Sequence, residues 1–406
     1  MDPRRAELPA PAPRRMGSRS PHRTTRVLAV DHTAGVAPFR KKFEALAAHP
    51  GIELTVLAPD RWVENYRVVR VTAGGQPGYR LLTGAVGWPG YENRGFFRSG
   101  LGPAIRSVRP DVLHLWEEPF SVITLQALSL AAIWAPSAKA IFFSFDNLSA
   151  GFRYSYRPSW LYAQIERFAH RRCAAGTAVS EEVAQVLRAK GFRKPLEVIP
   201  HGIDLAEYSA LRSPAEDVRG RLGLEPPVVG FVGRLLPQKG VDLLLRAVAL
   251  LPSPRPSILI LGDGPARGAL EGVAADLGFG SIRFLSGVQH DAVRGVMAAI
   301  DVLVLPSRTT PKWKEQFGRV LVEGMAAGCV VVGSSSGAIP EVVGDAGLIF
   351  PEDDVEALAQ ALRRALGEPG LKEALRIRGL KRVRERFTWE TIASKIVDFY
   401  ARILAG

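Results

Sequence analysis

Short apolar runs alternate with longer amphipathic stretches along most of the chain. In the first half, the runs that we expect to form strands are residues 25–31, 52–58, 66–72, 79–83, 111–115, 138–144, 176–179 and 196–199. Segments with a helical pattern lie between several of them, at residues 38–48, 122–135 and 160–172, and Ser180 is expected to begin another helix. Strands that alternate with helices predict a parallel, doubly wound sheet.

A second alternation of the same kind begins at Pro227, after a turn at His201 and a polar linker. Its expected strands are residues 228–232, 257–261, 282–284, 302–305, 330–333 and 347–350, and helices are expected to start near Gly240, Ala266, Ala292, Gly318, Ile339 and Val355. The pattern therefore predicts an α/β fold of two Rossmann-like domains that face a cleft, with ligands at the carboxyl ends of the strands. We expect residues 24–205 to form the first domain and residues 206–388 the second.

Charge adds a preference for anionic partners. The chain of 406 residues carries a net charge of +13, of which the first 25 residues contribute +4 through six arginines and two acids. Such an excess suits phosphorylated substrates, acidic lipid headgroups or nucleic acid, although no basic-aromatic nucleic-acid motif accompanies it. Residues 1–23 are rich in Arg and Pro and have no apolar core, so we expect a disordered tail, with Met16 as an alternative start.

The remaining composition points to an intracellular protein without a structural metal. Cys173 and Cys329 lie far apart in apolar surroundings and are expected to be free thiols in a reducing compartment. No CxxC or HxxxH spacing is present. The longest apolar run, residues 122–135, is too short to span a bilayer and favours a core helix. We expect a cytoplasmic location.

The segment with the clearest chemistry runs from Glu315 to Gly328 and contains a second acid, Glu323. We expect a loop up to Phe317, a helix that begins near Gly318, and Gly328 as its end. Free N–H groups and the positive helix end would then lie beside Glu315, where a phosphate fits. Eight helical residues span about 12 Å, which suits a sugar joined through a diphosphate to a ribose. The alternative is an N-terminal charge and a solvated helix face.

Two further loops carry candidate ligand-binding groups. Arg234 and Lys239 lie five residues apart after the first strand of the second half, where they could clamp a diphosphate, although two such cations are often merely solvated. Gly262 and Gly264 follow the next strand, but a third glycine comes only at Gly268, which disfavours a dinucleotide fingerprint. We expect these glycines to let a nucleotide base approach the backbone.

Together these motifs resemble the retaining glycosyltransferases of family 4, which have the GT-B fold. The resemblance covers nearly all of the chain after the tail and is strongest over residues 228–350. It implies that Glu315 binds donor-sugar hydroxyls, that Glu323 binds the nucleotide ribose, and that Arg234 and Lys239 hold the diphosphate. Glu315, Arg234 and Lys239 are thus the expected catalytic residues. The other implied donor-binding residues are Gly35, Gly233, Gly262, Gly264, Val288, Gln316, Phe317, Gly318 and Val320.

One position departs from the family pattern. Many members carry a second histidine after the Asp-x-x-His segment, where it contacts the donor sugar, but this chain has Trp116 there. His114 is a candidate contact or, alternatively, a buried strand histidine. Glu117, Glu118 and Asp146 are further candidates for the sugar or the acceptor.

The resemblance also implies a mechanism. The nucleoside diphosphate would leave while an acceptor hydroxyl attacks from the same face, and the diphosphate could take the proton, so neither a metal nor a cofactor is expected. The first domain would bind the acceptor, the second the UDP- or GDP-sugar, and residues 389–406 would form a last helix that crosses back to the first domain. By analogy we expect a hexosyltransferase for a glycan, lipid-linked or small-molecule acceptor in cell-surface polysaccharide or glycolipid synthesis.

Other readings stay open. They are a GT-B-fold epimerase or phosphorylase, and a non-catalytic protein that binds nucleic acid or lipid through its basic surface. A membrane contact is a separate hypothesis, since Arg40, Lys41 and Lys42 stand beside Phe39 and Phe43 in the helix expected at residues 38–48. That helix could touch the anionic inner face of the plasma membrane or be a solvated face. The oligomeric state is left open.

Overall fold

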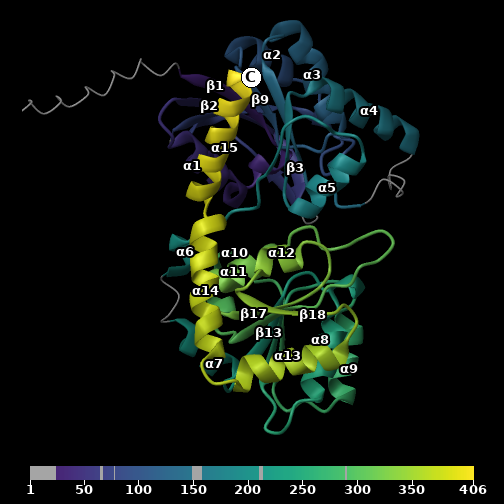
Figure 1. Ribbon diagram of the computed structural model, residues 1–406, viewed down its shortest axis with the longest axis vertical. Helices are drawn as coiled ribbons and strands as arrows, with labels where there is room; N and C mark the ends of the chain where they lie inside the picture. Colours follow the sequence, from purple (N-terminus) through teal and green to yellow (C-terminus); the bar gives the residue numbers. More distant parts are fainter. Residues whose placement is uncertain (1–23, 65–66, 77, 149–157, 210–213, 289) are drawn as a thin grey trace, which may run out of the picture.

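The computed structural model describes residues 24–406 except 65–66, 77, 149–157, 210–213 and 289. Figure 1 shows two α/β lobes, one above the other, with the last two helices running along both. The expectation for residues 1–23 lies outside the described residues. In the part of the chain that is described, no helix is long and apolar enough to cross a membrane.

The upper lobe is built on an eight-stranded sheet with the order β12-β11-β10-β9-β1-β2-β6-β5. Its strands pair in parallel except β5, which is antiparallel to β6. Their bounds are β1 Thr25–Val30, β2 Ile52–Pro59, β5 Gly74–Gln76, β6 Tyr79–Gly84, β9 Val112–Leu115, β10 Lys139–Ser144, β11 Ala175–Ala178 and β12 Leu196–Val198. Its helices include α1 Lys41–Ala47, α2 Leu101–Val108, α3 Val122–Trp134, α4 Ser159–Arg172 and α5 Glu181–Ala189. The predicted doubly wound sheet is confirmed here.

Two small hairpins stand apart from this sheet. One pairs β3 (Arg61–Glu64) with β4 (Arg67–Arg70), and the other pairs β7 (Val86–Gly87) with β8 (Phe96–Phe97). The connection between β7 and β8 is a loop that reaches the cleft. Of these strands, only β4 falls within a segment that was expected to be extended.

The lower lobe is built on a six-stranded parallel sheet with the order β15-β14-β13-β16-β17-β18. Its strands are β13 Val228–Val232, β14 Ser257–Leu261, β15 Ile282–Leu285, β16 Val302–Leu305, β17 Val330–Ser334 and β18 Gly347–Phe350. Its helices are α6 Ala206–Ser209, α7 Pro214–Leu222, α8 Val241–Ala249, α9 Arg267–Asp276, α10 His290–Ala298, α11 Arg319–Ala327, α12 Ile339–Val343, α13 Val355–Gly367 and α14 Leu371–Arg386. Every strand expected in this half is present.

The chain passes between the lobes twice at one place. The linker residue Ile203 donates its N–H to the Phe387 carbonyl at 2.8 Å and accepts from the Trp389 N–H at 3.2 Å. Beyond that junction α15 (Trp389–Ala405) packs along α1 of the upper lobe (Figure 1). Tyr400 of α15 hydrogen-bonds to His114 in β9 at 2.6 Å. The expected return of the last helix to the first domain is therefore confirmed.

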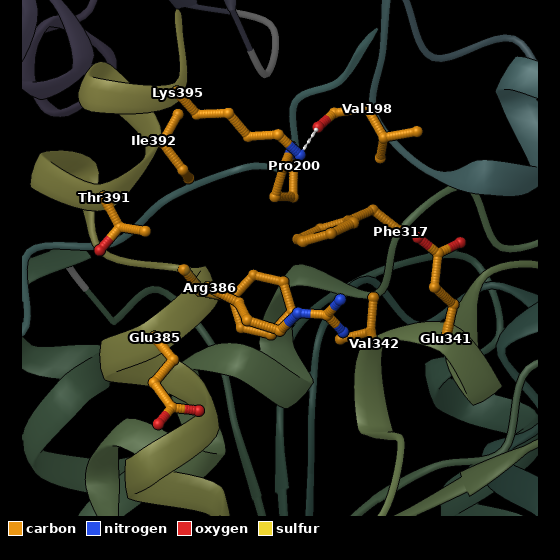
Figure 2. Close-up of a pocket in the computed structure, with 11 residues that line it drawn as sticks. Val198, Pro200, Phe317, Glu341, Val342, Glu385, Arg386, Thr391, Ile392 and Lys395 are labelled. Atoms are coloured by element: carbon orange, nitrogen blue, oxygen red, sulfur yellow. Dashed lines mark hydrogen bonds between the residues drawn. The ribbon is translucent and has the colours of Figure 1, made fainter. Parts of the chain in front are cut away.

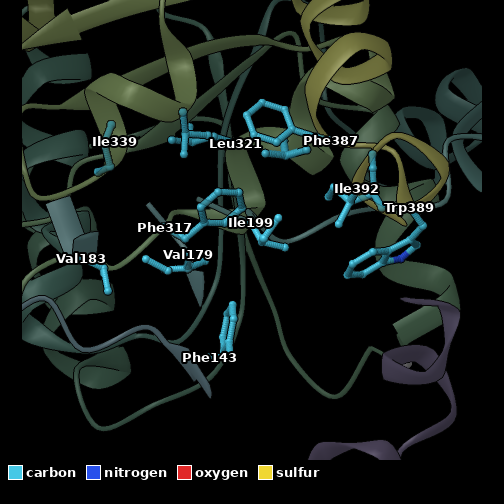
Figure 3. Packing of buried hydrophobic residues seen from close by; sticks show 14 of the residues in the cluster. Phe143, Val179, Val183, Ile199, Phe317, Leu321, Ile339, Phe387, Trp389 and Ile392 are labelled. Atoms are coloured by element: carbon cyan, nitrogen blue, oxygen red, sulfur yellow. The ribbon is translucent and has the colours of Figure 1, made fainter. Parts of the chain in front are cut away.

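An apolar cluster continues across this junction (Figure 3). Phe317 lies at its centre, with its ring centroid 5.4 Å from that of His201 and 5.9 Å from that of Phe387. The ring thus contacts both crossing segments at once. Since Phe317 precedes α11, the loop before that helix is packed directly against the hinge.

Candidate active site

A cavity of about 350 Å³ lies between the two lobes. Its upper wall comes from the end of β1, the turn after it, α1 and the ends of β9 and β10, and its lower wall from the loop before α11. The lining residues are Asp31, His32, Thr33, Phe39, Lys42, Glu92, Trp116, Phe143, Phe145, Val179, His201, Glu315, Gln316, Phe317, Gly318, Arg319 and Trp389. This is the position expected for a ligand of two facing Rossmann-like domains.

The lower wall is the N-terminus of α11. Gly318 caps the helix with φ 78°, and Gly328 ends it with φ 85°, both in the left-handed region that favours glycine. A Cβ on Gly318 would also meet Leu305 at 3.2 Å. Because Gly318 lines the cavity, the unpaired N–H groups of the first helical turn lie at the cavity wall. The predicted loop and helix are confirmed.

Glu315 is buried at this wall, and both its side-chain carboxylate and its backbone carbonyl accept hydrogen bonds. Its Oε2 accepts from Lys239 Nζ at 2.6 Å and from Ser307 Oγ at 2.9 Å. Its carbonyl accepts from Asn147 Nδ2 of the upper lobe at 2.9 Å. The sequence prediction that Glu315 and Lys239 share one site agrees with this geometry. The ion pair also means that Lys239 must exchange partners to reach a phosphate.

Glu323 and Arg234, unlike Glu315, lie away from the cavity. Glu323 forms an ion pair at 2.9 Å with Arg319, one turn earlier on α11. Burial raises the pKa of Tyr208, and the charge of Glu323 raises it further. Arg319 lines the cavity and stacks over Phe39 of the upper lobe at 5.9 Å. Arg234 is exposed and makes no ion pair within the described part of the chain. Neither Glu323 nor Arg234 lines the cavity.

The glycines after β13 and β14 have a packing reason that the sequence did not reveal. Gly262 and Gly264 have φ 156° and 155°, and Gly233 has φ 153°. A Cβ on Gly262 would lie 1.8 Å from the Gly233 carbonyl oxygen, and one on Gly264 would lie 2.3 Å from the Leu235 carbonyl oxygen. The two loops therefore touch through their backbones, which requires glycine even without a ligand.

Three other expected donor contacts do not line the cavity. Gly35 lies in the turn after β1, where a Cβ would meet Val71 at 3.0 Å. Val288 lies partly buried in the turn before α10, and Val320 packs against the core from the start of α11. Their proposed ligand contacts stay predictions.

The upper wall carries two ion pairs that the sequence analysis missed. Asp31 contacts Lys42 at 2.5 Å, and His32 Nδ1 contacts both carboxylate oxygens of Glu117 at 2.9 Å. Burial opposes the charge on His32, but Glu117 prevails and raises the pKa of His32 to about 9. Burial also acts on Asp31, yet Lys42 keeps the pKa of that carboxyl below its usual value. His32 is therefore a cation at neutral pH, with Nε2 as its second ring donor.

The same groups form the one cluster with metal-ligand geometry among the described residues. Ligand atoms of Asp31, His32 and Glu117 all lie within 4.8 Å of one another. The cations of His32 and Lys42 already neutralise both carboxylates, so the cluster has no free negative charge for a metal ion.

Trp116 and His114 occupy different positions, although they are two residues apart. Trp116 lines the cavity, and Lys42 Nζ stands 4.4 Å from its ring centroid. His114 lies behind it, stacked at 4.6 Å, fully buried and hydrogen-bonded to Tyr400. Burial lowers the pKa of His114 to about 3, so it is neutral. Of the two descriptions considered for His114, the buried strand histidine is the one that this position fits.

Glu118 and Asp146 support the wall without lining it. Glu118 is buried and accepts from the N–H groups of Phe145 and Asp146 and from Ser144 Oγ at 2.7–3.1 Å. Burial and the nearby Asp146 raise the pKa of Glu118 to about 8. Asp146 pairs with Lys190 at 3.0 Å. These contacts fix the end of β10, from which Phe145 reaches the cavity.

His201 is a further lining residue that the sequence analysis treated only as a turn. Burial and the neighbouring cations Arg319 and Lys42 lower the pKa of His201 to about 3. A neutral imidazole in the linker thus faces the same cavity as the cationic His32. No local pattern distinguished either histidine, since each follows a strand in the manner of any polar turn residue.

A second, smaller cavity of about 140 Å³ lies at the hinge (Figure 2). Phe317 forms one of its walls, opposite Ile392 and Thr391 of α15, and Lys395 closes it by donating to the Val198 carbonyl at 2.7 Å. Because Phe317 belongs to both cavities, the aromatic ring separates the hinge from the main cleft.

Two Rossmann-like lobes, an interdomain cavity and a returning C-terminal helix define the GT-B class. Solved structures agree: sucrose-phosphate synthase from Thermosynechococcus elongatus superposes with a TM-score of 0.70 at 22% identity, covering 93% of this chain and 99% of that one. Anabaena HepE in complex with UDP gives 0.69 at 20% identity, covering 93% and 100%. At such identities the likeness concerns the fold alone.

The family follows from the sequence relatives. The family model for Glycosyltransferase Family 4 matches residues 43–207, and the model for Glycosyl transferases group 1 matches residues 226–368. The chain is 31% identical over 254 residues to 2-deoxystreptamine glucosyltransferase of Streptomyces kanamyceticus, covering 60% of this chain and 64% of the relative. It is 30% identical over 262 residues to a GDP-mannose-dependent alpha-(1-6)-phosphatidylinositol monomannoside mannosyltransferase of Mycobacterium tuberculosis, covering 61% and 67%. The chain belongs to the family 4 glycosyltransferases.

The name of a third relative refers to a different acceptor. D-inositol 3-phosphate glycosyltransferase of Jonesia denitrificans is 32% identical over 226 residues, covering 51% of this chain and 51% of the relative. The matched segments span about half to two-thirds of the relatives' lengths.

Proposed function

We propose that the protein is a retaining hexosyltransferase that moves a sugar from a UDP- or GDP-sugar to a hydroxyl group of an acceptor in the interdomain cleft. The observation that carries this proposal is Glu315, which lines the cavity between two Rossmann-like lobes beside the N-terminus of α11 and is paired with Lys239 behind it. The relatives support the class of reaction, since one is named a glucosyltransferase and another uses GDP-mannose.

The residues of this chain have distinct roles in the proposal. The N–H groups of the first turn of α11 would receive the diphosphate, because the helix end favours an anion. Glu315 would turn its carboxylate from Lys239 to the sugar hydroxyls, which would free the lysine for the diphosphate. Lys239, Arg319 and the exposed Arg234 would then offset the charge that develops on the leaving oxygens. No metal is required in this scheme, because cations and helix end supply the positive charge.

Cell-surface polysaccharide or glycolipid assembly is the pathway class we propose, by analogy with the relatives. The membrane hypothesis for residues 38–48 stays a proposal, and three of the five side chains that motivated it have partners within the protein. Phe43 is fully buried, Lys42 pairs with Asp31, and Lys41 pairs with Glu44 and Asp204.

The direct test is a panel of nucleotide sugars offered with hydroxylated acceptors, with products followed by mass spectrometry and the anomeric configuration read by NMR. We expect one donor to be consumed, release of UDP or GDP, and retention at the anomeric carbon. Glu323→Ala should abolish turnover without unfolding the protein, while the matched change Glu373→Ala on exposed α14 should not alter it. Inversion would refute the retaining mechanism, and isomerised donor or phosphate-dependent release would favour the epimerase or phosphorylase reading.

A further inference from the structure

The loop between β7 and β8 is held firmly, although it lies at the surface. The carbonyl of Tyr91 accepts from the N–H groups of Arg94 and Gly95 at 3.1 and 2.7 Å. Gly90, with φ 91°, lies so close to Val63 of β3 that a Cβ would approach its side chain to 2.8 Å. The loop therefore has a defined conformation over the upper wall of the cleft, and its residue Glu92 lines the cavity.

Two large aromatic side chains precede Glu92 in this loop and are exposed to solvent. Trp88 and Tyr91 are each 61% exposed. Trp88 also has φ 54°, and a bulky residue in the left-handed region is an outlier that costs about 1–3 kcal/mol and is typically found at ligand clamps. Exposed aromatic faces on the loop that carries Glu92 suit a ring-shaped ligand with apolar C–H faces.

Charge pairing singles out Glu92. The other charged side chains that line the cavity all have partners among the described residues: Asp31 with Lys42, His32 with Glu117, Glu315 with Lys239, and Arg319 with Glu323. Glu92 is exposed and has no ion-pair partner in that part of the chain, and its field contributes to the raised pKa of His32. The upper wall thus offers one uncompensated negative charge and no uncompensated positive one.

We propose that residues 88–94 form the acceptor-recognition loop, and that the acceptor is a hydroxylated ring that is uncharged or carries an amino group rather than a phosphate. This inference rests on the proposed function. Glu92 accepts hydrogen bonds from ring hydroxyl or ammonium groups, while the faces of Trp88 and Tyr91 cover the C–H surface and favour a nearby cation.

A phosphorylated ring is disfavoured by the same groups. Its negative charge would face Glu92. It could recruit Lys42 or His32 only by leaving Asp31 or Glu117 buried without a counter-ion, which is strongly unfavourable.

The test compares three ligands with one ring skeleton: an inositol, an aminodeoxy-inositol and an inositol monophosphate. Binding to the full chain with UDP is measured by saturation-transfer NMR and calorimetry, which need no turnover. We expect the amino ring to bind best and the phosphate worst. Glu92→Gln should weaken the amino ring about tenfold, the loss of one charge-assisted hydrogen bond, and the inositol less than threefold. Glu92→Lys should reverse the order.

Trp88→Ala and Tyr91→Ala should each weaken both rings, the amino ring more than the inositol because it also loses a cation–π contact, and should leave UDP binding unchanged. Glu53→Gln, an exposed glutamate on β2, is the matched control. Tighter binding of the phosphate by the wild-type chain, or equal binding of the amino ring by Glu92→Gln, would overturn the inference. Donor consumption, measured in parallel, tests the proposed function separately, because hydrolysis of a nucleotide sugar by water requires neither Glu92 nor an acceptor.

Discussion

The two walls of the cleft are built in opposite ways. The lower wall comes from one continuous segment, the loop and helix from Glu315 to Gly328, whose glycines set the helix ends. The upper wall is assembled from separate segments, and its charged groups Asp31 and His32 are neutralised by Lys42 and Glu117. The lower wall is thus a local structure with a recognisable pattern. The upper wall is a tertiary structure that exists only when distant strands pair.

This difference has an energetic consequence. At the lower wall Glu315 lines the cavity, and the side chains of Lys239 and Glu315 keep 18% and 10% of their surface exposed, so a ligand can replace one partner by another. At the upper wall Asp31 and Glu117 are almost fully buried, and neither can lose its cation without a large desolvation penalty. We therefore expect changes in the Glu315–Lys239 pair of the lower wall to affect turnover and changes in the buried ion pairs of the upper wall to affect stability.

The largest effect is expected for Lys42→Met. The substitution keeps the apolar stem but leaves Asp31 buried without its counter-ion, which should lower the free energy of unfolding by about 3–5 kcal/mol. Urea denaturation followed by circular dichroism measures the change. Lys41→Met, which alters a half-exposed neighbour paired with Glu44, should cost about 0.2–1 kcal/mol. Equal effects of the two substitutions would contradict the contrast between the walls.

Glu315→Gln should have the opposite effect, with a large loss of turnover and little loss of stability. It keeps the side-chain volume but removes the carboxylate that we assign to the donor sugar, so kcat should fall about 100- to 1000-fold while the free energy of unfolding changes little. Initial rates and a urea titration of the same preparation measure both quantities. Glu356→Gln, in the exposed first turn of α13, is the control and should leave kcat unchanged. If kcat of Glu315→Gln were undiminished, the assignment of a chemical role to the lower wall would be wrong.

Tyr400→Phe probes how α15 supports the upper wall. Without the phenol, the buried Nδ1 of His114 loses its hydrogen-bond partner, which should cost about 1–3 kcal/mol in unfolding free energy. KM for the donor should stay the same, because neither residue lines the cavity. Tyr91→Phe, at an exposed position, should be neutral in the same denaturation experiment. A change in donor KM without a loss of stability would contradict this assignment.

Titration of His32 tests the upper wall without a change of its other residues. Its pKa of about 9 in the folded protein lies above the unfolded value of 6.5, so the pairing with Glu117 stabilises the fold fully below pH 6.5. This contribution is lost as the pH rises through 9. The difference in unfolding free energy between the wild type and His32→Gln should therefore shrink between pH 6.5 and pH 9.5. A difference that stays constant or grows over this range would show that His32 is not held as a cation.

The sequence predicted the fold well because its signals are local. Buried strands such as residues 228–232 and 257–261 are short apolar runs, and Gly318 and Gly328 mark helix ends by backbone conformation alone. The helix α14 (Leu371–Arg386) was not predicted. It is rich in charged residues, and only a few of its positions are buried, so it lacks a clear apolar stripe.

The candidate site was predicted only where it is continuous in sequence. Glu315, Phe317 and Gly318 were identified with their surroundings, and Lys239 was assigned to the same pocket. His32 was missed as a site residue because its significance depends on Glu117, which lies 85 positions after it, and Asp31 and Lys42 were missed because they pair with each other between a strand end and a helix. Arg234, which was expected to hold the diphosphate together with Lys239, is exposed and does not line the cavity. A contact between residues so far apart in the sequence does not show in the hydrophobic periodicity of either segment.

The return of α15 to the upper lobe has a consequence for how the polypeptide is made. Tyr400 of α15 lies 286 positions after its partner His114 in β9, so the first lobe cannot complete this contact until α15 has been synthesised. The sheets of both lobes need only strands that lie together in the chain, within residues 25–198 and 228–350, so each sheet can form before that contact is made. During synthesis the surface of α1 that α15 covers therefore stays uncovered until the whole second lobe has been made.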